Sequence, residues 1–240
     1  MSTKENQKEK PSGSAAAPAA PASANVNSFK DEFEKIYLEN IRRDGADKLL
    51  KYLKDSDFFV APASTKFHSN HANGLVKHSV MVYHRLAKLL EAEYGADWRK
   101  CPTASPGRGA VVSSDVPGEF LLGESAAVIA LLHDVCKVGC YKTSERNVKV
   151  GTEWTKKPYF SFDDPLPYGH GEKSVYMISG FMRLSREEAM AINWHMGSYD
   201  SRSNYSNYTL SDAFQKFPLA LLCHAADLIA SYLDESIEKY

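Results

Sequence analysis

The sequence predicts an all-α domain that carries one small β-hairpin and follows a disordered N-terminal tail. Three observations support this fold class. Most segments after residue 28 repeat their apolar residues every three or four positions, the period of a helix that packs on one side. A single segment alternates apolar and polar residues instead. The first 28 residues contain hardly any large apolar side chain.

The tail, residues 1–28, consists mainly of Pro, Ala, Ser and a few mixed charges. Such a segment cannot bury enough apolar surface to offset the entropy lost on ordering, so we expect it to be disordered. It has no Arg and carries Glu5 and Glu9, which argues against a mitochondrial transit peptide. Residues 29–240 are expected to form one helical domain, with its core in about 60–235.

Helical periodicity recurs along this domain and predicts helices over residues 29–41, 46–59, 73–94, 124–138, 171–182, 185–196 and 217–240. Segment 124–138 is almost entirely apolar and is therefore expected to be buried. Ser185 and Glu188 have the spacing of a capping box, which predicts a helix that starts there.

The remaining segments are expected to be a hairpin and loops. Residues 147–162 alternate around a polar centre and predict the hairpin; their aromatic side chains could stack a base, although cross-strand packing is the commoner use. Residues 99–120 contain three Pro and three Gly and are expected to form a surface loop. The polar stretch 198–208 is expected to be a loop that lines or covers the mouth of a cleft.

Charge and composition exclude some classes of protein. The 29 basic and 30 acidic residues nearly cancel, which argues against dependence on polyanions but leaves room for a local basic groove. Four cysteines follow no zinc-finger spacing. Because the chain shows no signal peptide and no apolar run near 18 residues, we expect a reducing, cytoplasmic location and no membrane association.

The clearest functional signal is the pair His133-Asp134 inside the apolar run AAVIALLHDVCKVG. Burying a carboxylate and an imidazole is costly unless a cation holds them, and a metal ion turns that cost into ligand bonds. Other isolated His and Asp residues lie in apolar segments of other predicted helices, or just before one in the case of His170, as in the internal metal site of a helical bundle. The candidate metal ligands are His78, His133, Asp134, His170, His195 and Asp227.

Adjacent residues on a helix diverge by about 100°. This would let His133 bind one ion terminally while Asp134 bridges two. Mixed nitrogen and oxygen ligands suit one or two ions of Mn²⁺, Fe²⁺, Mg²⁺ or Zn²⁺. Plainer readings remain open: His170 could cap the following helix, and His195 and Lys137 could be cations at helix C-termini.

The order His, His-Asp, His, His, Asp resembles the HD superfamily of metal-dependent phosphohydrolases over about residues 60–235. The segments that carry the resemblance are GLVKHSV, LLHDVCK and HAADLIAS. GHGEKSV followed by WHMG is also similar to the HD domain at the end of certain 3′–5′ exoribonucleases. Several of those relatives have His-His where this chain has Trp194-His195.

The resemblance implies an HD-domain helical bundle with a binuclear site. His78, His133, Asp134 and Asp227 would bind the first ion, with Asp134 bridging, and His170 and His195 would complete the second. A metal-activated hydroxide would then cleave a phosphomonoester or phosphodiester, most readily in a nucleotide or short oligonucleotide. Asp134 and Lys137 would be catalytic, and the expected substrate contacts are Lys137, Arg146, His68, His71 and Lys173, with Lys142 and Tyr168 as weaker candidates.

Two other functions fit the same residues. A di-iron oxygenase of the inositol-oxygenase type uses a similar order of His and Asp, and would consume O₂. A non-catalytic nucleotide sensor would bind its ligand tightly without product. Release of phosphate that depends on metal would separate the phosphohydrolase from both.

Overall fold

The computed structural model describes residues 24–103, 120–204 and 207–235. These residues are mostly helical, with a single two-stranded antiparallel sheet. The helices of this described part are α1 (Ala24–Asn40), α2 (Ala46–Asp55), α3 (Gly74–Tyr94), α4 (Leu122–Leu132), α5 (His170–Ser179), α6 (Arg186–Asn193), α7 (Asn207–Lys216) and α8 (Pro218–Ile229).

Shorter helical turns connect or extend these helices. A π-helix continues α8 directly, and four 3₁₀ turns lie between the longer elements. These short elements are η1 (Trp98–Lys100), η2 (Val135–Lys137), η3 (Gly197–Tyr199), η4 (Ser201–Asn204) and the π-helix η5 (Ala230–Asp234).

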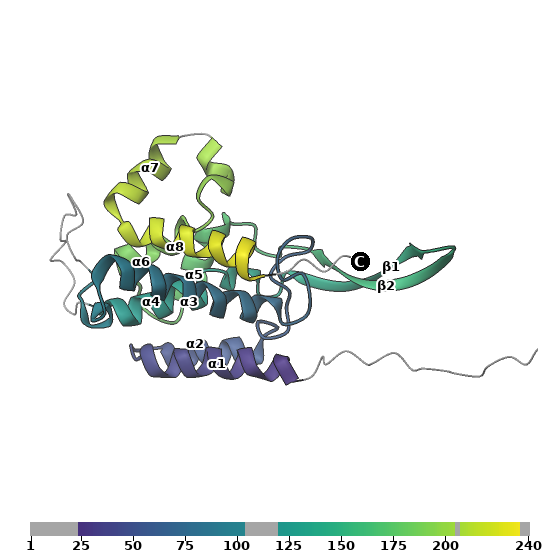
Figure 1. The fold of residues 1–240 in the computed structure, drawn as a ribbon, viewed down its shortest axis with the longest axis horizontal. Coiled ribbons are helices and arrows are strands. Elements are labelled where there is room, and N and C mark those ends of the chain that lie inside the picture. The colour runs from purple at the N-terminus through teal and green to yellow at the C-terminus, as the bar shows by residue number, and fades with distance from the viewer. Residues whose placement is uncertain (1–23, 104–119, 205–206, 236–240) are drawn as a thin grey trace, which may run out of the picture.

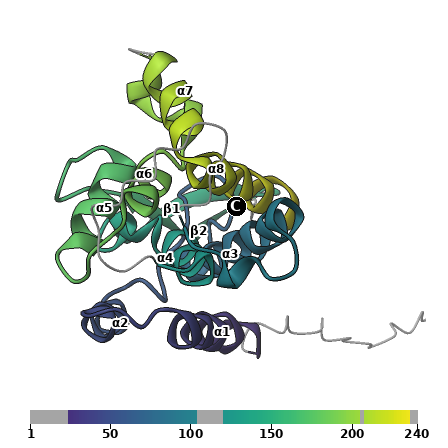
Figure 2. The ribbon, with the colours of Figure 1, turned by 90° about the vertical axis from the view of Figure 1, so that its left-hand side faces the viewer.

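The core forms where α3, α4, α6 and α8 pack against one another. Helix α4 lies at its centre, and every residue of α4 except Glu124 is buried, as its apolar sequence predicts. Helices α1 and α2 form a layer on one side of this core, and α7 lies on the opposite side (Figures 1 and 2). The fold therefore places α4, which leads into His133, deep inside the bundle.

The hairpin consists of β1 (Tyr141–Val150) and β2 (Glu153–Phe162), and it projects from one end of the helical body (Figure 1). Its turn is Gly151-Thr152, where Gly151 has φ +65°. A two-residue hairpin turn needs a positive φ, which glycine adopts without a steric penalty.

Several expected boundaries differ from the structure. Helix α1 begins at Ala24, inside the stretch expected to be disordered, while residues 1–23 lie outside the described residues. The hairpin starts at Tyr141 rather than at residue 147, because the polar residues of its first strand hide the alternation. Helix α7 forms where no helix was expected. The capping box of Ser185 and Glu188 is confirmed.

The helix expected over 124–138 was also too long. Helix α4 ends at Leu132, and His133 and Asp134 occupy the turn that leads into η2. Most of the loop expected over 99–120 lies outside the described residues, namely 104–119. Its two ends meet, because Pro102 and Leu121 form an antiparallel bridge.

In the described residues, no single helix is both long and apolar enough to cross a membrane. One bent pair of helical segments passes that test by length and composition, Tyr208–Lys216 with Pro218–Asp234, and its halves meet at 107°.

Candidate metal centre

The bundle brings all six predicted metal ligands together from separate elements. His78 lies in the second turn of α3, His170 begins α5, and Asp227 lies in α8. His195 follows α6 by two residues, and the His133-Asp134 pair lies between α4 and η2. Five of these residues are at most 9% exposed. The imidazole of His170 is 29% exposed and lies toward solvent.

One half of the cluster is formed by His78, His133, Asp134 and Asp227. The Nε2 atoms of His78 and His133 are 3.1 Å apart. Asp227 Oδ1 lies 3.2 Å from His78 Nε2, and Asp134 Oδ2 lies 3.5 Å from both imidazole Nε2 atoms. Ligands about 2.0–2.2 Å from one ion are separated from each other by roughly 3.0–3.4 Å, so these spacings fit a shared metal ion.

The other half is formed by Asp134, His170 and His195. Asp134 Oδ1 lies 2.8 Å from His170 Nε2 and 3.5 Å from His195 Nε2. The two oxygens of Asp134 therefore face different pairs of imidazoles. The buried His and Asp side chains could hold a metal ion, and Asp134 is common to two of the groups with suitable spacing.

Three imidazoles are oriented by hydrogen bonds from their Nδ1 atoms. His133 donates to the Ala130 carbonyl at 2.9 Å, and His195 donates to the Ile192 carbonyl at 2.7 Å. His78 donates to Glu235 Oε1 at 2.7 Å. A neutral imidazole that carries its proton on Nδ1 presents a lone pair at Nε2, which is the atom that binds metal.

One Nε2 atom of the cluster has no partner without a cation. His195 Nε2 is buried and has no hydrogen-bond partner in the structure. Burial lowers the pKa of His133 to about 3 despite the neighbouring Asp134, so its lone pair is available at neutral pH. A buried nitrogen without a hydrogen-bond partner, like that of His195, is costly, and a metal ion beside it would remove that cost.

The cluster also carries excess negative charge. Burial by itself would raise the pKa of both Asp134 and Asp227. Lys137 nevertheless holds the pKa of Asp134 well below the usual range, and His78 does the same for Asp227. Burial would lower the pKa of His78, but Glu235 and Asp227 outweigh it and raise the pKa to about 10. Without metal, a proton on His78 therefore supplies charge that a divalent ion would otherwise provide.

Lys137 lies beside this cluster, where its Nζ donates to Asp134 Oδ2 at 2.6 Å. Burial alone would lower the pKa of Lys137, but Asp134 outweighs it and raises that pKa, so the ammonium stays charged. Its side chain is 12% exposed and lines a pocket of about 250 Å³. The pocket lies at the base of the hairpin and is lined by Ala63, Ser64, Thr65, Phe67, His68, His78, Asp134, Lys137, Tyr141, Phe162, Met196 and Asp227.

His68 lies in this pocket, with its ring centroid 4.8 Å from that of His78. Burial lowers the pKa of His68 to about 4, and its Nε2 is buried without a hydrogen-bond partner. His71, the other histidine predicted to contact substrate, does not line the pocket. Its Nδ1 bonds the carbonyl of Ala72 instead, 2.9 Å away.

Lys173 and Arg146 do not lie where substrate contacts were expected. Lys173 is only 3% exposed, is paired with Asp164, and lies 3.3 Å from Cys140 Sγ, so it stabilises the loop before α5. Arg146 is exposed on the hairpin, with its guanidinium 5.6 Å from the ring of Tyr159. It lies five residues beyond Tyr141, or about 17 Å along an extended strand.

The two weaker candidates also lie away from the cluster. Lys142 pairs with Asp163 on the surface, and Tyr168 stacks on Tyr176, with ring centroids 5.3 Å apart. Neither lines the pocket. Proximity along the chain to His170 or to the His-Asp pair therefore did not produce proximity in space.

Glu235 is the important site residue that sequence reasoning missed. Burial would raise the pKa of Glu235, but His78 outweighs burial and lowers it to about 2. The carboxylate is fully buried and anchors the His78 ring. The only sequence signal for Glu235 is that it is an acid about two helical turns after Asp227. Neighbouring acids in this terminal segment, such as Asp234, fit that description almost equally well.

The loop after α6 is held by two further contacts that keep His195 in place. His224 Nδ1 bonds the backbone carbonyl of His195 at 2.7 Å. Gly197 has φ +53°, and a Cβ on it would lie 2.4 Å from the imidazole of His224. Glycine is therefore required where this loop passes His224.

Comparison of the chain with protein-family models, with curated proteins and with solved structures finds no match. Its function must therefore be argued from the chemistry of the site. That chemistry is a buried set of imidazoles and carboxylates, a charged lysine and an adjoining pocket.

Proposed function

We propose that this chain is a metal-dependent phosphohydrolase of the HD type, acting on a phosphomonoester or phosphodiester in a nucleotide or short oligonucleotide. The observation that carries the proposal is the position of Asp134. Each of its carboxylate oxygens faces a different pair of imidazoles, as expected of a carboxylate shared by two metal ions. The order of the ligands along the chain is also that of the HD superfamily.

We assign His78, His133, Asp134 and Asp227 to one ion, and Asp134, His170 and His195 to the other. Four imidazoles make this donor set better suited to Fe²⁺, Mn²⁺ or Zn²⁺ than to Mg²⁺. Divalent ions held here supply activation of water and neutralisation of the charge that develops on phosphorus. Cys136 lies 3.5 Å from His170 and shares a group of suitable spacing with His170 and Asp134; without metal, burial raises the pKa of its thiol to about 12 and keeps it neutral.

The side chains of the protein supply the remaining chemistry. Lys137 presents a permanent positive charge to the pocket, where it can hold a phosphate oxygen. Asp134 keeps that ammonium in place, and Glu235 fixes the His78 ring. The four cysteines are all free, which supports a reducing compartment such as the cytoplasm.

The decisive experiment combines elemental analysis of the purified chain with a screen of phosphate esters and cyclic nucleotides in Mn²⁺. We expect His133→Ala and Asp134→Ala to lose bound metal and turnover together, because both side chains belong to the ligand set. His84→Ala is the matched control, since His84 is half exposed on α3 and pairs with Glu32. Full activity after complete removal of metal would contradict the proposal, and metal-dependent O₂ consumption without phosphate release would favour the oxygenase.

Lys137→Met tests the role of the lysine separately. We expect metal content to be unchanged and turnover to fall by about 10²-fold or more, the usual cost of losing one charge-stabilising donor. The readouts are metal content and kcat on the best ester from the screen. Loss of metal in this variant, or an unchanged rate, would show that Lys137 does not contact the substrate.

A further inference from the structure

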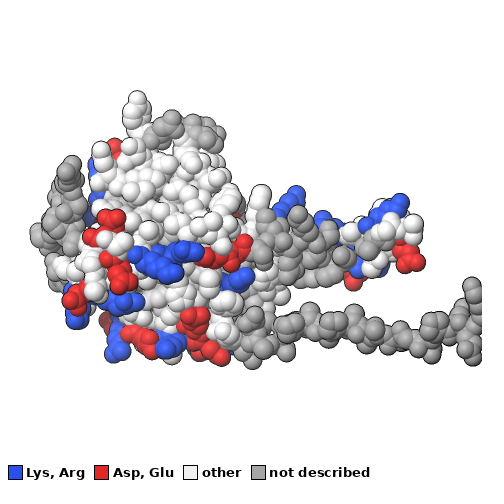
Figure 3. Space-filling view, viewed as in Figure 1, with Lys and Arg blue, Asp and Glu red and all other residues white. Residues whose placement is uncertain are grey.

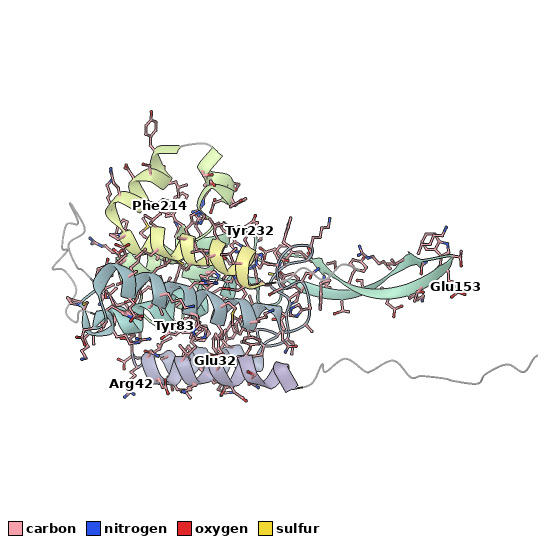
Figure 4. The ribbon with its side chains drawn as sticks, in the orientation of Figure 1. Glu32, Arg42, Tyr83, Glu153, Phe214 and Tyr232 are labelled. Atoms are coloured by element: carbon pink, nitrogen blue, oxygen red, sulfur yellow. The ribbon has the colours of Figure 1, made fainter. Side chains whose placement is uncertain are left out.

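The hairpin of β1 and β2 is built as an arm. In the described residues its extensive packing is between its own two strands, and it extends away from the helices (Figure 1). Figure 4 places Glu153, the first residue of β2, at the end of the hairpin farthest from the helical body. A two-stranded ribbon alone is marginally stable in water, so an exposed arm of this length suggests a binding role.

The charge of the arm differs from that of the whole chain. Residues 141–162 contain five basic and two acidic side chains, in a protein whose net charge is −1. Figure 3 shows lysine and arginine side chains distributed along the arm. The ion pair between Lys156 and Glu145 is exposed, at 73% and 65%, and therefore weak. The arm is a local basic surface.

Aromatic residues lie on the same face as some of these charges. Cross-strand partners share a face, and the register pairs Tyr141 with Phe162 at the base and Lys149 with Trp154 at the tip. Three further pairs lie between them on this face: Thr143 with Phe160, Glu145 with Pro158, and Asn147 with Lys156. Trp154 is 70% exposed and Phe162 is 51% exposed, although contact between large aromatic rings and water is unfavourable.

This face leads into the candidate metal centre. Tyr141 and Phe162 belong to the hairpin and also line the pocket that contains Asp134 and Lys137. From this pair to the tip, β1 runs through ten residues, or about 30 Å. An extended ligand that lies along this face would therefore place one of its ends, or a segment within it, in the pocket.

We propose that this face of the hairpin binds single-stranded nucleic acid and guides it into the pocket. Aromatic rings stack on bases, and lysines contact phosphates, which is the combination that sequence-tolerant single-strand binders use. The inference rests on the proposed function, because it names an oligonucleotide rather than a mononucleotide as substrate. A second copy of the chain is a poorer occupant, since two basic arms repel each other and lysines on an edge oppose strand addition.

Binding can be measured without catalysis. The full chain, treated with chelator, is titrated with labelled single-stranded DNA and RNA of about four, eight and sixteen nucleotides, and anisotropy is recorded. Affinity should rise until the strand spans the arm, at about nine nucleotides if the bases stack at about 3.4 Å. The DNA and RNA series identify which polymer is preferred, and a duplex serves as the negative control.

Tryptophan fluorescence provides a local readout. The chain has three tryptophans, and Trp98 and Trp194 are buried, at 1% and 4% exposed, so quenching by an oligonucleotide reports Trp154. Trp154→Ala should abolish the quenching and weaken binding at least about fivefold. Lys149→Gln with Lys156→Gln should flatten the slope of log affinity against log salt by about 1.4.

The matched control is Lys51→Gln with Lys54→Gln on α2, both exposed and outside the arm, at 75% and 40%. It should bind as the unmodified chain does, and melting curves verify that each variant is folded. Three outcomes would each overturn the inference. The hairpin variants could bind oligonucleotides normally, a mononucleotide could bind as tightly as an oligonucleotide, or the hairpin could support a dimer without binding any oligonucleotide. Hydrolysis of small esters without oligonucleotide binding would overturn only the nucleic-acid-binding role of the hairpin. Oligonucleotide binding without any hydrolysis would overturn only the proposed function.

Discussion

At the scale of single residues, hydrogen bonds at Nδ1 decide what each histidine can do. His133 and His195 each donate to a carbonyl three residues earlier, a contact that a residue at the end of a helix makes with its own last turn. His78, inside α3, has no free carbonyl nearby and uses Glu235 instead. The result in all three cases is an Nε2 atom directed into the cluster.

Glu235→Gln tests this orientation. The amide can still accept a hydrogen bond from His78, but it loses the charge that makes the imidazole more basic. We expect metal affinity to fall at least about tenfold, in line with the effect of other outer partners of metal-binding histidines. The measurement is a metal titration of the chelator-treated chain, with the exposed Glu91→Gln as control. Unchanged affinity would show that Glu235 has only a packing role.

Residue identity and order predicted which His and Asp side chains gather in the cluster, whereas only His68 and Lys137 of the five candidate substrate contacts line the pocket. A lone His or Asp in an apolar segment is costly to bury, so its presence there already indicates a partner. Lysines and arginines carry no such signal, because long cationic side chains are common on surfaces. Lys173 is accordingly buried against Asp164, and Arg146 lies out on the arm.

At the scale of elements, the end of α4 determines the shape of the site. His133 is still helical, with φ −55° and ψ −33°, whereas Asp134 turns to φ −103° and ψ 14°. The turn lets both oxygens of Asp134 face imidazoles, and it starts η2, which brings Lys137 back to the same carboxylate. Apolar periodicity continues through this turn, so the sequence pattern could not reveal it.

The connection between α1 and α2 is joined to α4 and α6 by a buried ion pair. Arg43 makes two hydrogen bonds to Glu188, at 2.7 and 2.8 Å, and a third to Glu124 at 3.1 Å. Arg43→Met should lower the free energy of unfolding by about 3–5 kcal/mol, because it leaves a buried carboxylate unpaired. Denaturant unfolding measures this, and Arg42→Met, an exposed neighbour, should change stability little. Equal effects of the two changes would contradict the prediction.

Glu187 in α6 predicts a pH dependence. Burial raises its pKa to about 7, although the backbone N–H of Leu219 partly opposes this. Between the unfolded pKa near 4.5 and the folded value, the folded chain binds more protons, so stability falls as pH rises. We expect Glu187 to account for a loss of about 1–3 kcal/mol from pH 5 to pH 8.

Glu187→Gln should remove that part of the pH dependence, and the melting temperature from pH 5 to pH 8 measures it. Glu93→Gln, an exposed acid in the last turn of α3, is the control. A melting profile that keeps its original slope in Glu187→Gln would refute the assignment.

At the scale of the whole molecule, the candidate metal centre joins elements that are far apart in the sequence. Its candidate ligands come from α3, the turn after α4, α5, the segment after α6, and α8. A divalent ion that binds only the folded chain stabilises it by mass action, by about 2.7 kcal/mol at one hundred times Kd. For a chain of this size, that corresponds to a rise in Tm of about 5–10 °C.

Calorimetry with Mn²⁺ and with chelator checks this expectation. The unmodified chain should melt at a higher temperature in Mn²⁺, and His133→Ala should melt at the same temperature in both conditions. A Tm that is independent of metal in the unmodified chain would mean that the cluster holds no ion under those conditions.

The sequence by itself determined the mostly helical class, the hairpin and the six candidate ligands, because burial imposes a period on apolar residues and a penalty on isolated polar ones. Only the tertiary structure decided which charged residues surround the cluster. Glu235 follows the π-helix Ala230–Asp234, whose wider turn changes the phase of the residues after it, and so it reaches His78. Such a contact depends on how two helices pack, and no local pattern records that packing.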